Sequence, residues 1–417
     1  MKTEKQIKSD HGSNQVLAGV NVLDFGWALF GALTGRYLGD HGATVVKVES
    51  ANRLDTPRRV PMSVKSSVDD YDDSPWFTHL NSSKYGLQID LKHPRAKDVI
   101  NRLIAWADII NENYSPGVMN RLGFGYEQAR AIKPDIIMVS NSVYGQTGPK
   151  AHRRGNDGHG ATLSGLLYLT GYTNDQGPII PNPPYGDVIV PFVSVAAVVA
   201  ALDYRRRTGK GQHIDTSMVE VCSHQTTPAF LEYKANKRLG SRQGNRIAHA
   251  APHGVFPCSG DDNWCAICVF TDQEWEAFCD VIGNPSWSRE SRFTDLAERK
   301  ANEDDLDQLV AEWTQTQTAQ EVMSRLQAAG VPAGVVQNMQ DIVDLDPQLK
   351  ARNFLKQLKH PVIGEFGHLT TPYKLSKTDA DVWTSPCMGQ HNELVCKDFL
   401  GMSDAEFDEL SAQNVFV

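Results

Sequence analysis

The chain has 417 residues, of which 41% are hydrophobic and 22% are charged, and its formal net charge is -9. This length exceeds the usual size of one hydrophobic core, so we expect a soluble protein of two domains. The acidic balance, with a pI near 5.8, argues against nucleic-acid binding, because a general nucleic-acid surface needs a basic stripe. Seven cysteines, an odd number, indicate a reducing compartment and no disulfide framework.

The N-terminal residues 1–15 are polar and lack an apolar core, so we expect no signal peptide. The longest uncharged apolar run, 188–202, is shorter than the roughly 20 residues that span a bilayer. We therefore expect this run to be a buried helix. The same observations predict no membrane association and a cytoplasmic location.

Strands and helices alternate through the first half of the chain. Short apolar segments predict β-strands at 20–25, 44–48, 108–113 and 136–140. Helical patterns separate them, at 31–41 and 95–107. This alternation implies parallel pairing, so the predicted fold class is α/β, with a doubly wound, Rossmann-like parallel sheet in a large domain. Ligands of such sheets bind at the carboxyl ends of the strands.

The order of elements changes in the second half. Residues 234–252 are polar without a core face and predict a linker out of the first part of the large domain, 1–233. A smaller α+β domain is predicted over 253–336, with a strand at 264–270. Cys265 and Cys268 have C-x-x-C spacing, but no second pair completes a tetrahedral zinc site, so we expect a core strand and no metal.

One carboxylate, Asp187, directly precedes the long apolar run. Pro191 fits the first turn of a helix, where a missing N–H costs nothing. Asp187 should therefore lie just outside the positive end of the helix, where the ionised form is favoured. Such a group is a candidate oxygen nucleophile, and the structural alternative is an Asp that caps the helix.

The chain resembles the class III CoA-transferases, the group of formyl-CoA transferase and carnitine CoA-transferase, which share their fold with alpha-methylacyl-CoA racemase. The resemblance rests on motifs in matching order along most of the chain: LAGVNVLDF at 17–25, LGDHGATVVKVE at 38–49, NSSKYGLQIDL at 81–91, NYSPGVMNRLG at 113–123, SNSVYGQTGP at 140–149, RTGKGQ at 207–212, AGVPAG at 329–334 and DPQL at 346–349. Each motif alone is weak, whereas their order and spacing together are specific.

The resemblance implies that 337–417 return to the large domain. It also implies an interlocked dimer, because family members thread two ring-like chains through each other. A homodimer is the default expectation, and a heterodimer with a related subunit is the alternative. The implied substrates are an acyl-CoA and a free carboxylic acid, with no tightly bound cofactor.

The implied chemistry centres on Asp187. Its carboxylate attacks the thioester carbonyl, giving a mixed anhydride and CoA thiolate; the thiolate then attacks the aspartyl carbonyl and releases the first acid. The second acid reverses these steps, so neither ATP nor metal is needed. Each tetrahedral oxygen needs preorganised donors, and the candidate backbone donors are Gly26, Gly31, Gly186 and the Ser259–Gly260 turn.

Matching the motifs residue by residue implies a CoA site. Lys84 and Arg121 correspond to phosphate contacts, Asn113 and Tyr114 lie beside the nucleotide, and Leu29 lines the thioester end.

The chain departs from the family at two of these places. Ser50 stands where relatives often have a basic residue, so Arg53 would substitute, and Ser142 stands where a Lys can occur. Arg58, Arg153 and Arg154 make a dicarboxylate such as succinate, delivered as succinyl-CoA, a candidate donor acid.

Two other functions stay open. A racemase uses a His-Asp dipeptide and a second Asp as two bases, but the chain has Asn156 and Asp157 there, so His159 would have to serve as a base. The other is a catalytically silent subunit of a heteromeric transferase, because Val190 and Pro191 follow Asp187 where relatives commonly carry Gly.

Overall fold

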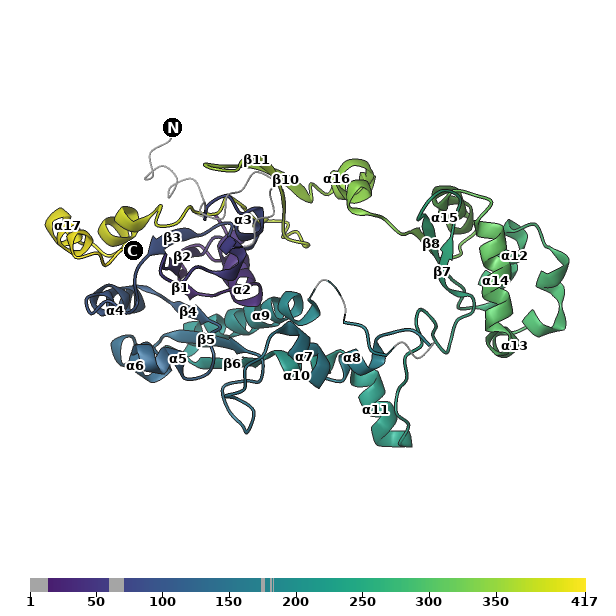
Figure 1. The fold of residues 1–417 in the computed structure, drawn as a ribbon, viewed down its shortest axis with the longest axis horizontal. Coiled ribbons are helices and arrows are strands. Elements are labelled where there is room, and N and C mark those ends of the chain that lie inside the picture. Colours follow the sequence, from purple (N-terminus) through teal and green to yellow (C-terminus); the bar gives the residue numbers. More distant parts are fainter. Residues whose placement is uncertain (1–13, 60–70, 174–176, 181, 183) are drawn as a thin grey trace. The chain divides into compact units, whose positions relative to one another are not determined.

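The computed structural model describes residues 14–59, 71–173, 177–180, 182 and 184–417 (Figure 1). Contacts within the chain define two compact units. The first consists of Met1–Leu167, Ile180–Lys237 and Gln348–Val417, and the second of Tyr168–Ile179 and Arg238–Pro347. The domain boundaries expected from the sequence stay a prediction. The N-terminal segment 1–15 was expected not to be a signal peptide, and its residues 1–13 lie outside the described residues.

The first unit is built on a six-stranded sheet with the order β3-β2-β1-β4-β5-β6. Its strands are β1 (Asn21–Phe25), β2 (Thr44–Glu49), β3 (Tyr85–Gln88), β4 (Ile109–Glu112), β5 (Ile137–Ser142) and β6 (His213–Ser217). Every neighbouring pair is parallel, which confirms the predicted α/β class. Strand order reverses between β1 and β4, the place where doubly wound sheets bind ligands.

The sheet is buried on both faces, as its continuous apolar strands require. Alternate residues such as Leu23, Val46 and Ile110 pack on α4 (Ala96–Trp106). The residues between them, including Val22 and Val45, pack on α2 (Phe30–Asp40) and α9 (Tyr185–Thr208). The sequence missed β3 and β6, because both are short edge strands whose residues are not predominantly apolar.

Helix α9 differs from its prediction. It spans 24 residues and begins at Tyr185, so Asp187 lies within its first turn and Pro191 lies inside the helix. Pro191 has no N–H for the carbonyl of Asp187, four residues earlier. By length and composition alone α9 could cross a membrane, because the helix extends beyond the apolar run 188–202 at both ends. It packs on α2 and β5.

The second unit has a three-stranded antiparallel sheet with the order β7-β8-β9. Its strands are β7 (His253–Pro257), β8 (Trp264–Cys268) and β9 (Ala333–Val335), and its longer helices are α12 (Asp272–Val281), α14 (Glu303–Thr314) and α15 (Ala319–Ala328). Cys265 is buried in this core and Cys268 is half-buried. Within the described residues, no group of three His, Cys, Asp or Glu could hold a metal ion.

The C-terminal segment of the first unit forms the hairpin β10 (Leu355–His360) and β11 (Gly364–Leu369). Arg36 of α2 donates to the Leu369 carbonyl and pairs with Asp40, which fastens the hairpin to the helix. The remaining α-helices are α3 (Pro75–Leu80), α5 (Val118–Leu122), α6 (Tyr126–Ile132), α7 (Asp157–Leu163), α8 (Leu166–Leu169), α10 (Met218–His224), α11 (Thr227–Asn236), α13 (Leu296–Ala301), α16 (Pro347–Ala351) and α17 (Asp404–Ala412).

Candidate active site

A cavity of about 290 Å³ lies where the carboxyl ends of β1, β4 and β5 meet the start of α9. Its lining comes from five chain segments and contains Trp27, Ala28, Phe30, Arg53, Asn113, Tyr114, Ser115, Pro116, Ser142, Val143, Tyr144, Ala151, Arg153, Gly155, Asn156, Asp157 and Asp187. This is the switch point of the sheet, so the cavity stands where the fold favours ligand binding.

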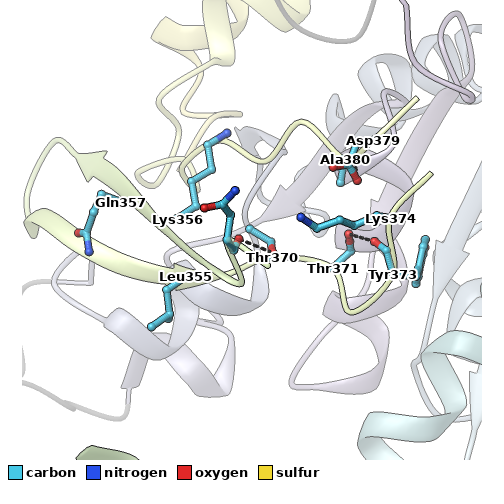
Figure 2. Close-up of a pocket in the computed structure, with 10 residues that line it drawn as sticks. Leu355, Lys356, Gln357, Thr370, Thr371, Tyr373, Lys374, Asp379 and Ala380 are labelled. Atoms are coloured by element: carbon cyan, nitrogen blue, oxygen red, sulfur yellow. Dashed lines mark hydrogen bonds between the residues drawn. The ribbon is translucent and has the colours of Figure 1, made fainter. Parts of the chain in front are cut away.

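A second hollow of about 460 Å³ lies along the C-terminal hairpin (Figure 2). Its lining includes Lys356, Lys374 and Asp379, and the Thr371 hydroxyl donates to the Tyr373 carbonyl at its edge. It shares no lining residue with the cavity at Asp187. Although its volume is larger, this hollow is therefore not part of the site around Asp187.

Asn113 clamps the loop that follows β1. Its amide oxygen accepts from the Trp27 N–H at 2.7 Å, and its amide nitrogen donates to the Trp27 carbonyl at 2.9 Å. A Cβ on Gly31 would lie 2.3 Å from that oxygen, so glycine is required there. Tyr114 packs edge-on against the Trp27 ring. Asn113 and Tyr114 thus shape the cavity wall, and their place beside the nucleotide stays a prediction.

Buried charged residues hold the same loop, which follows β1, through hydrogen bonds to its backbone. Ala28 has a left-handed φ of 53°, which is unfavourable for a residue with a Cβ. Its N–H donates to Asp55 at 2.8 Å, and Lys47 bridges Asp55 and the Gly26 carbonyl at 3.2 and 2.7 Å. This network stabilises a loop conformation that local sequence preference does not favour.

Lys84 is bonded to residues of β1 and α2 and does not line the cavity. It is fully buried, and its ammonium donates to Asp24 at 2.8 Å, to the Ala32 carbonyl at 2.7 Å and to Asn81 at 3.0 Å. Burial lowers the pKa of Lys84 to about 8. Because all three donors are used inside the protein, none is left in this structure for a phosphate.

Three other basic or apolar candidates lie apart from the cavity. Leu29 precedes α2 and packs beside the cluster of Ala32, Leu33 and Leu80, outside the cavity lining. Arg121 is exposed near the end of α5 and is also outside that lining. Arg58 is buried between Glu49 and Asp72 in ion pairs of 2.8 and 2.7 Å, so its guanidinium is committed to the fold.

Two arginines do reach the cavity. Arg53 lies over the Trp27 ring, 4.9 Å from its centroid. Arg153 lines the cavity, and within the described residues it makes no side-chain hydrogen bond or ion pair. Trp27 was missed in the sequence, although its position directly after the first strand was a usable signal.

The surroundings of Asp187 oppose its ionisation. Burial, and then the charge of Asp157, raise the pKa of Asp187 to about 7. The sequence had predicted that the ionised form of Asp187 is favoured, because the residue was expected to lie at the positive end of the helix. One oxygen of Asp157 instead accepts from the N–H groups of Gly186 at 2.6 Å and Asp187 at 3.1 Å. Asp157 therefore takes up the N–H groups of Gly186 and Asp187 in the first turn of α9.

The two features that suggested other functions have structural explanations. His159 is exposed, outside the cavity lining, and hydrogen-bonds Asn156 at 2.8 Å at the start of α7. Val190 packs against Phe30 and Met218 in the core. It does not line the cavity, so the cavity at Asp187 is open despite the residue change after it.

Comparison with known proteins gives concordant matches. The model of the family described as CoA-transferase family III matches residues 17–392. A probable CoA-transferase of Mycobacterium tuberculosis is 32% identical over 412 residues, which cover 95% of this chain and only 50% of that protein, so the chain spans about half its length. The succinyl-CoA–D-citramalate CoA-transferase of Chloroflexus aurantiacus is 30% identical, with 95% of this chain and 97% of that protein covered.

A solved structure is also similar to this fold. A CAIB/BAIF family protein from Brucella suis superposes with a TM-score of 0.84 and 29% sequence identity. The match covers 93% of this chain and 100% of that one. The similarity therefore extends over both compact units, not over the parallel sheet alone.

Proposed function

Because the chain belongs to CoA-transferase family III, we propose that it moves CoA from an acyl-CoA to a free carboxylic acid through covalent intermediates on Asp187. The observation that carries this proposal is the position of Asp187 at the cavity on the switch point of the sheet. Because its pKa is near 7, the Asp187 side chain is ionised in about half of the molecules at neutral pH, and its anion is more basic than an ordinary carboxylate.

In the first step a carboxylate oxygen of Asp187 bonds to the thioester carbonyl carbon, and the C–S bond breaks to release CoA thiolate. The thiolate then attacks the aspartyl carbonyl, which frees the first acid as its carboxylate. The second acid attacks the resulting aspartyl-CoA thioester and displaces the thiolate, which gives a second mixed anhydride. The thiolate then attacks the acyl carbonyl of that anhydride, forming the new acyl-CoA and freeing the Asp187 carboxylate. Each step exchanges one acyl bond for another, so no external energy source is required.

Two of the backbone N–H groups suggested as oxyanion donors are already used in hydrogen bonds. The N–H of Gly26 donates to Asp24 and that of Gly186 to Asp157, so both are occupied. The amides of the first turn of α2, which begins with the cavity residue Phe30, have no partner within their own helix. We place oxyanion or phosphate binding there.

Among the described residues that line this cavity, Arg53 and Arg153 are the cations. We assign Arg53 to a CoA phosphate and Arg153 to the distal carboxylate of the acid. This assignment makes a dicarboxylate such as succinate the preferred substrate class. The relative that acts on succinyl-CoA and citramalate supports it, since both of those acids carry two carboxylates.

We further propose that the active form is an interlocked dimer, by default of two identical chains. Apolar side chains on α9 and α11 support a covering partner, because they are 38% to 59% exposed: Phe192, Val193, Phe230 and Leu231. Isolated exposed apolar groups are ordinary, but two pairs of adjacent exposed apolar residues favour an interface. Light scattering at micromolar concentration tests this, and a compact monomer would contradict it.

The decisive experiment follows labelled CoA between two acids. Wild type should exchange it only when an acceptor acid is present, without solvent deuterium entering the alpha carbon. Asp187→Ala and Asp187→Asn should abolish exchange, and hydroxylamine should trap a modified Asp187. Retained turnover in well-folded Asp187→Ala would disprove the mechanism.

His159→Ala is the control, with exchange expected within about tenfold of wild type, or roughly 1.4 kcal/mol in barrier. Deuterium uptake that depends on His159 would instead identify a racemase. Exchange that appears only after a related subunit is added would identify a silent subunit.

A further inference from the structure

Asp157 lies where the start of α7 meets the start of α9. Its side chain is buried, with the residue only 8% exposed, and one oxygen accepts from the N–H groups of Gly186 and Asp187. A Cβ on Gly186 would lie 2.8 Å from that oxygen and 2.9 Å from Met218. The missing side chain of Gly186 is therefore what allows Asp157 to reach the helix backbone.

We infer that Asp157 is a positioning residue that keeps the Asp187 carboxylate reactive, by occupying the amides at the start of α9 and by repelling the Asp187 charge. This inference rests on the proposed function, since it assigns Asp157 a role in acylating Asp187.

Two N–H donors in the first turn of α9 bond to Asp157 and not to the side chain of Asp187. The amides of a first helical turn stabilise a nearby anion, and Asp187 itself stands in the first turn of α9. A carboxylate stabilised in this way is a poorer nucleophile. Because the Gly186 and Asp187 amides donate to Asp157, they do not stabilise the side chain that has to react.

The charge on Asp187 changes during the reaction. Within the described residues Asp157 has no cationic partner, so its charge faces Asp187 uncompensated by an ion pair. When Asp187 forms the C–O bond of the anhydride, its negative charge leaves with the CoA thiolate. Repulsion by Asp157 then disappears, so Asp157 favours the acylated over the free state of Asp187.

The other polar groups around Asp187 do not replace this effect. Arg53, Arg153 and Tyr114 line the cavity, and the two cations act in the opposite direction, towards a stabilised carboxylate. Tyr144 lines the same cavity. On α10, burial and the two Asp charges raise the pKa of Cys222 to about 11, so its thiol is neutral near pH 7.

The test compares neutral replacements of Asp157 in the full-length protein. Asp157→Asn retains an oxygen that accepts from both amides and removes the charge. We expect the acidic limb of the kcat/KM profile for CoA transfer to move about one pH unit lower, and the plateau rate to fall about fivefold or more. Asp157→Ser, a neutral cap of smaller size, serves as the second variant if the first folds poorly.

Glu112→Gln is the matched control. Glu112 is a buried carboxylate at the end of β4 whose pKa burial also raises to about 7, but it is outside the cavity lining. Its neutral variant retains the acceptor for the Tyr114 N–H, so the limb should stay where it is in wild type.

Two kinds of failure give different results. If transfer survives Asp187→Ala, the proposed function is wrong. If transfer needs Asp187 but the limb is unchanged in folded Asp157→Asn or Asp157→Ser, Asp157 is only a structural cap and this inference is overturned.

Discussion

Gly31→Ala is the sharpest test of how the loop after β1 is held. Within a helix this change ordinarily stabilises by about 1 kcal/mol. At Gly31 the new Cβ would lie 2.3 Å from the Asn113 amide oxygen and 2.4 Å from its carbon. Overpacking of this kind costs about 1–3 kcal/mol, and displacing Asn113 weakens two hydrogen bonds to Trp27, each worth about 1 kcal/mol.

The sum is a net destabilisation of about 2–4 kcal/mol, opposite in sign to the helix preference. We expect urea unfolding to show this loss, and kcat/KM for CoA transfer to fall at least about tenfold because the cavity wall moves. Gly158→Ala is the control: it also lies in a helix, but its Cβ would meet only Asn156, at 3.5 Å, so stability should rise slightly.

A double-mutant cycle isolates the contact between Gly31 and Asn113. In the Asn113→Ala background the obstructing amide is gone, so Gly31→Ala should cost markedly less than it does in wild type. If Gly31→Ala is as stable and as active as wild type, or costs the same in both backgrounds, the clamp is not what positions this loop.

Three further outcomes are expected. The ionised form of Asp187 is the attacking group, and burial raises the pKa of this side chain to about 7. We therefore expect kcat/KM to rise about tenfold per pH unit below pH 7 and to level off near pH 8. A flat profile from pH 5 to 8 would show that Asp187 has the pKa of an ordinary carboxylate. Lys84→Met leaves Asp24 buried without its ammonium partner. The free energy of unfolding, measured with urea, should fall by about 3–5 kcal/mol, while KM for acyl-CoA stays unchanged. A raised KM with unchanged stability would instead identify Lys84 as a phosphate contact. Arg153→Met should raise KM for a dicarboxylate about tenfold and leave a monocarboxylate unaffected, and equal effects on both acids would refute a distal carboxylate contact.

Local patterns in the sequence were sufficient for the central strands and their helices. The apolar strands β1, β2, β4 and β5 alternate with helical patterns, and each lies within about two residues of its predicted bounds. That is enough to predict a parallel sheet, because alternation of strand and helix leaves few other topologies. The order of the motifs likewise identified the family, and Asp187 was singled out by its position before the apolar run.

Tertiary structure decided which charged residues are available for chemistry. The resemblance implied a phosphate contact for Lys84, and the sequence suggested Arg58 as a basic residue near the site. Both are instead buried against carboxylates, Arg58 against Glu49 and Lys84 against Asp24, which is 60 positions away. Burial raises the pKa of Asp187, and so does the charge of Asp157, 30 positions earlier. A side chain's ionisation depends on burial and on charges a few ångströms away, and residues distant in sequence supply both, so local patterns determine the elements while the folded arrangement determines the chemistry of the site.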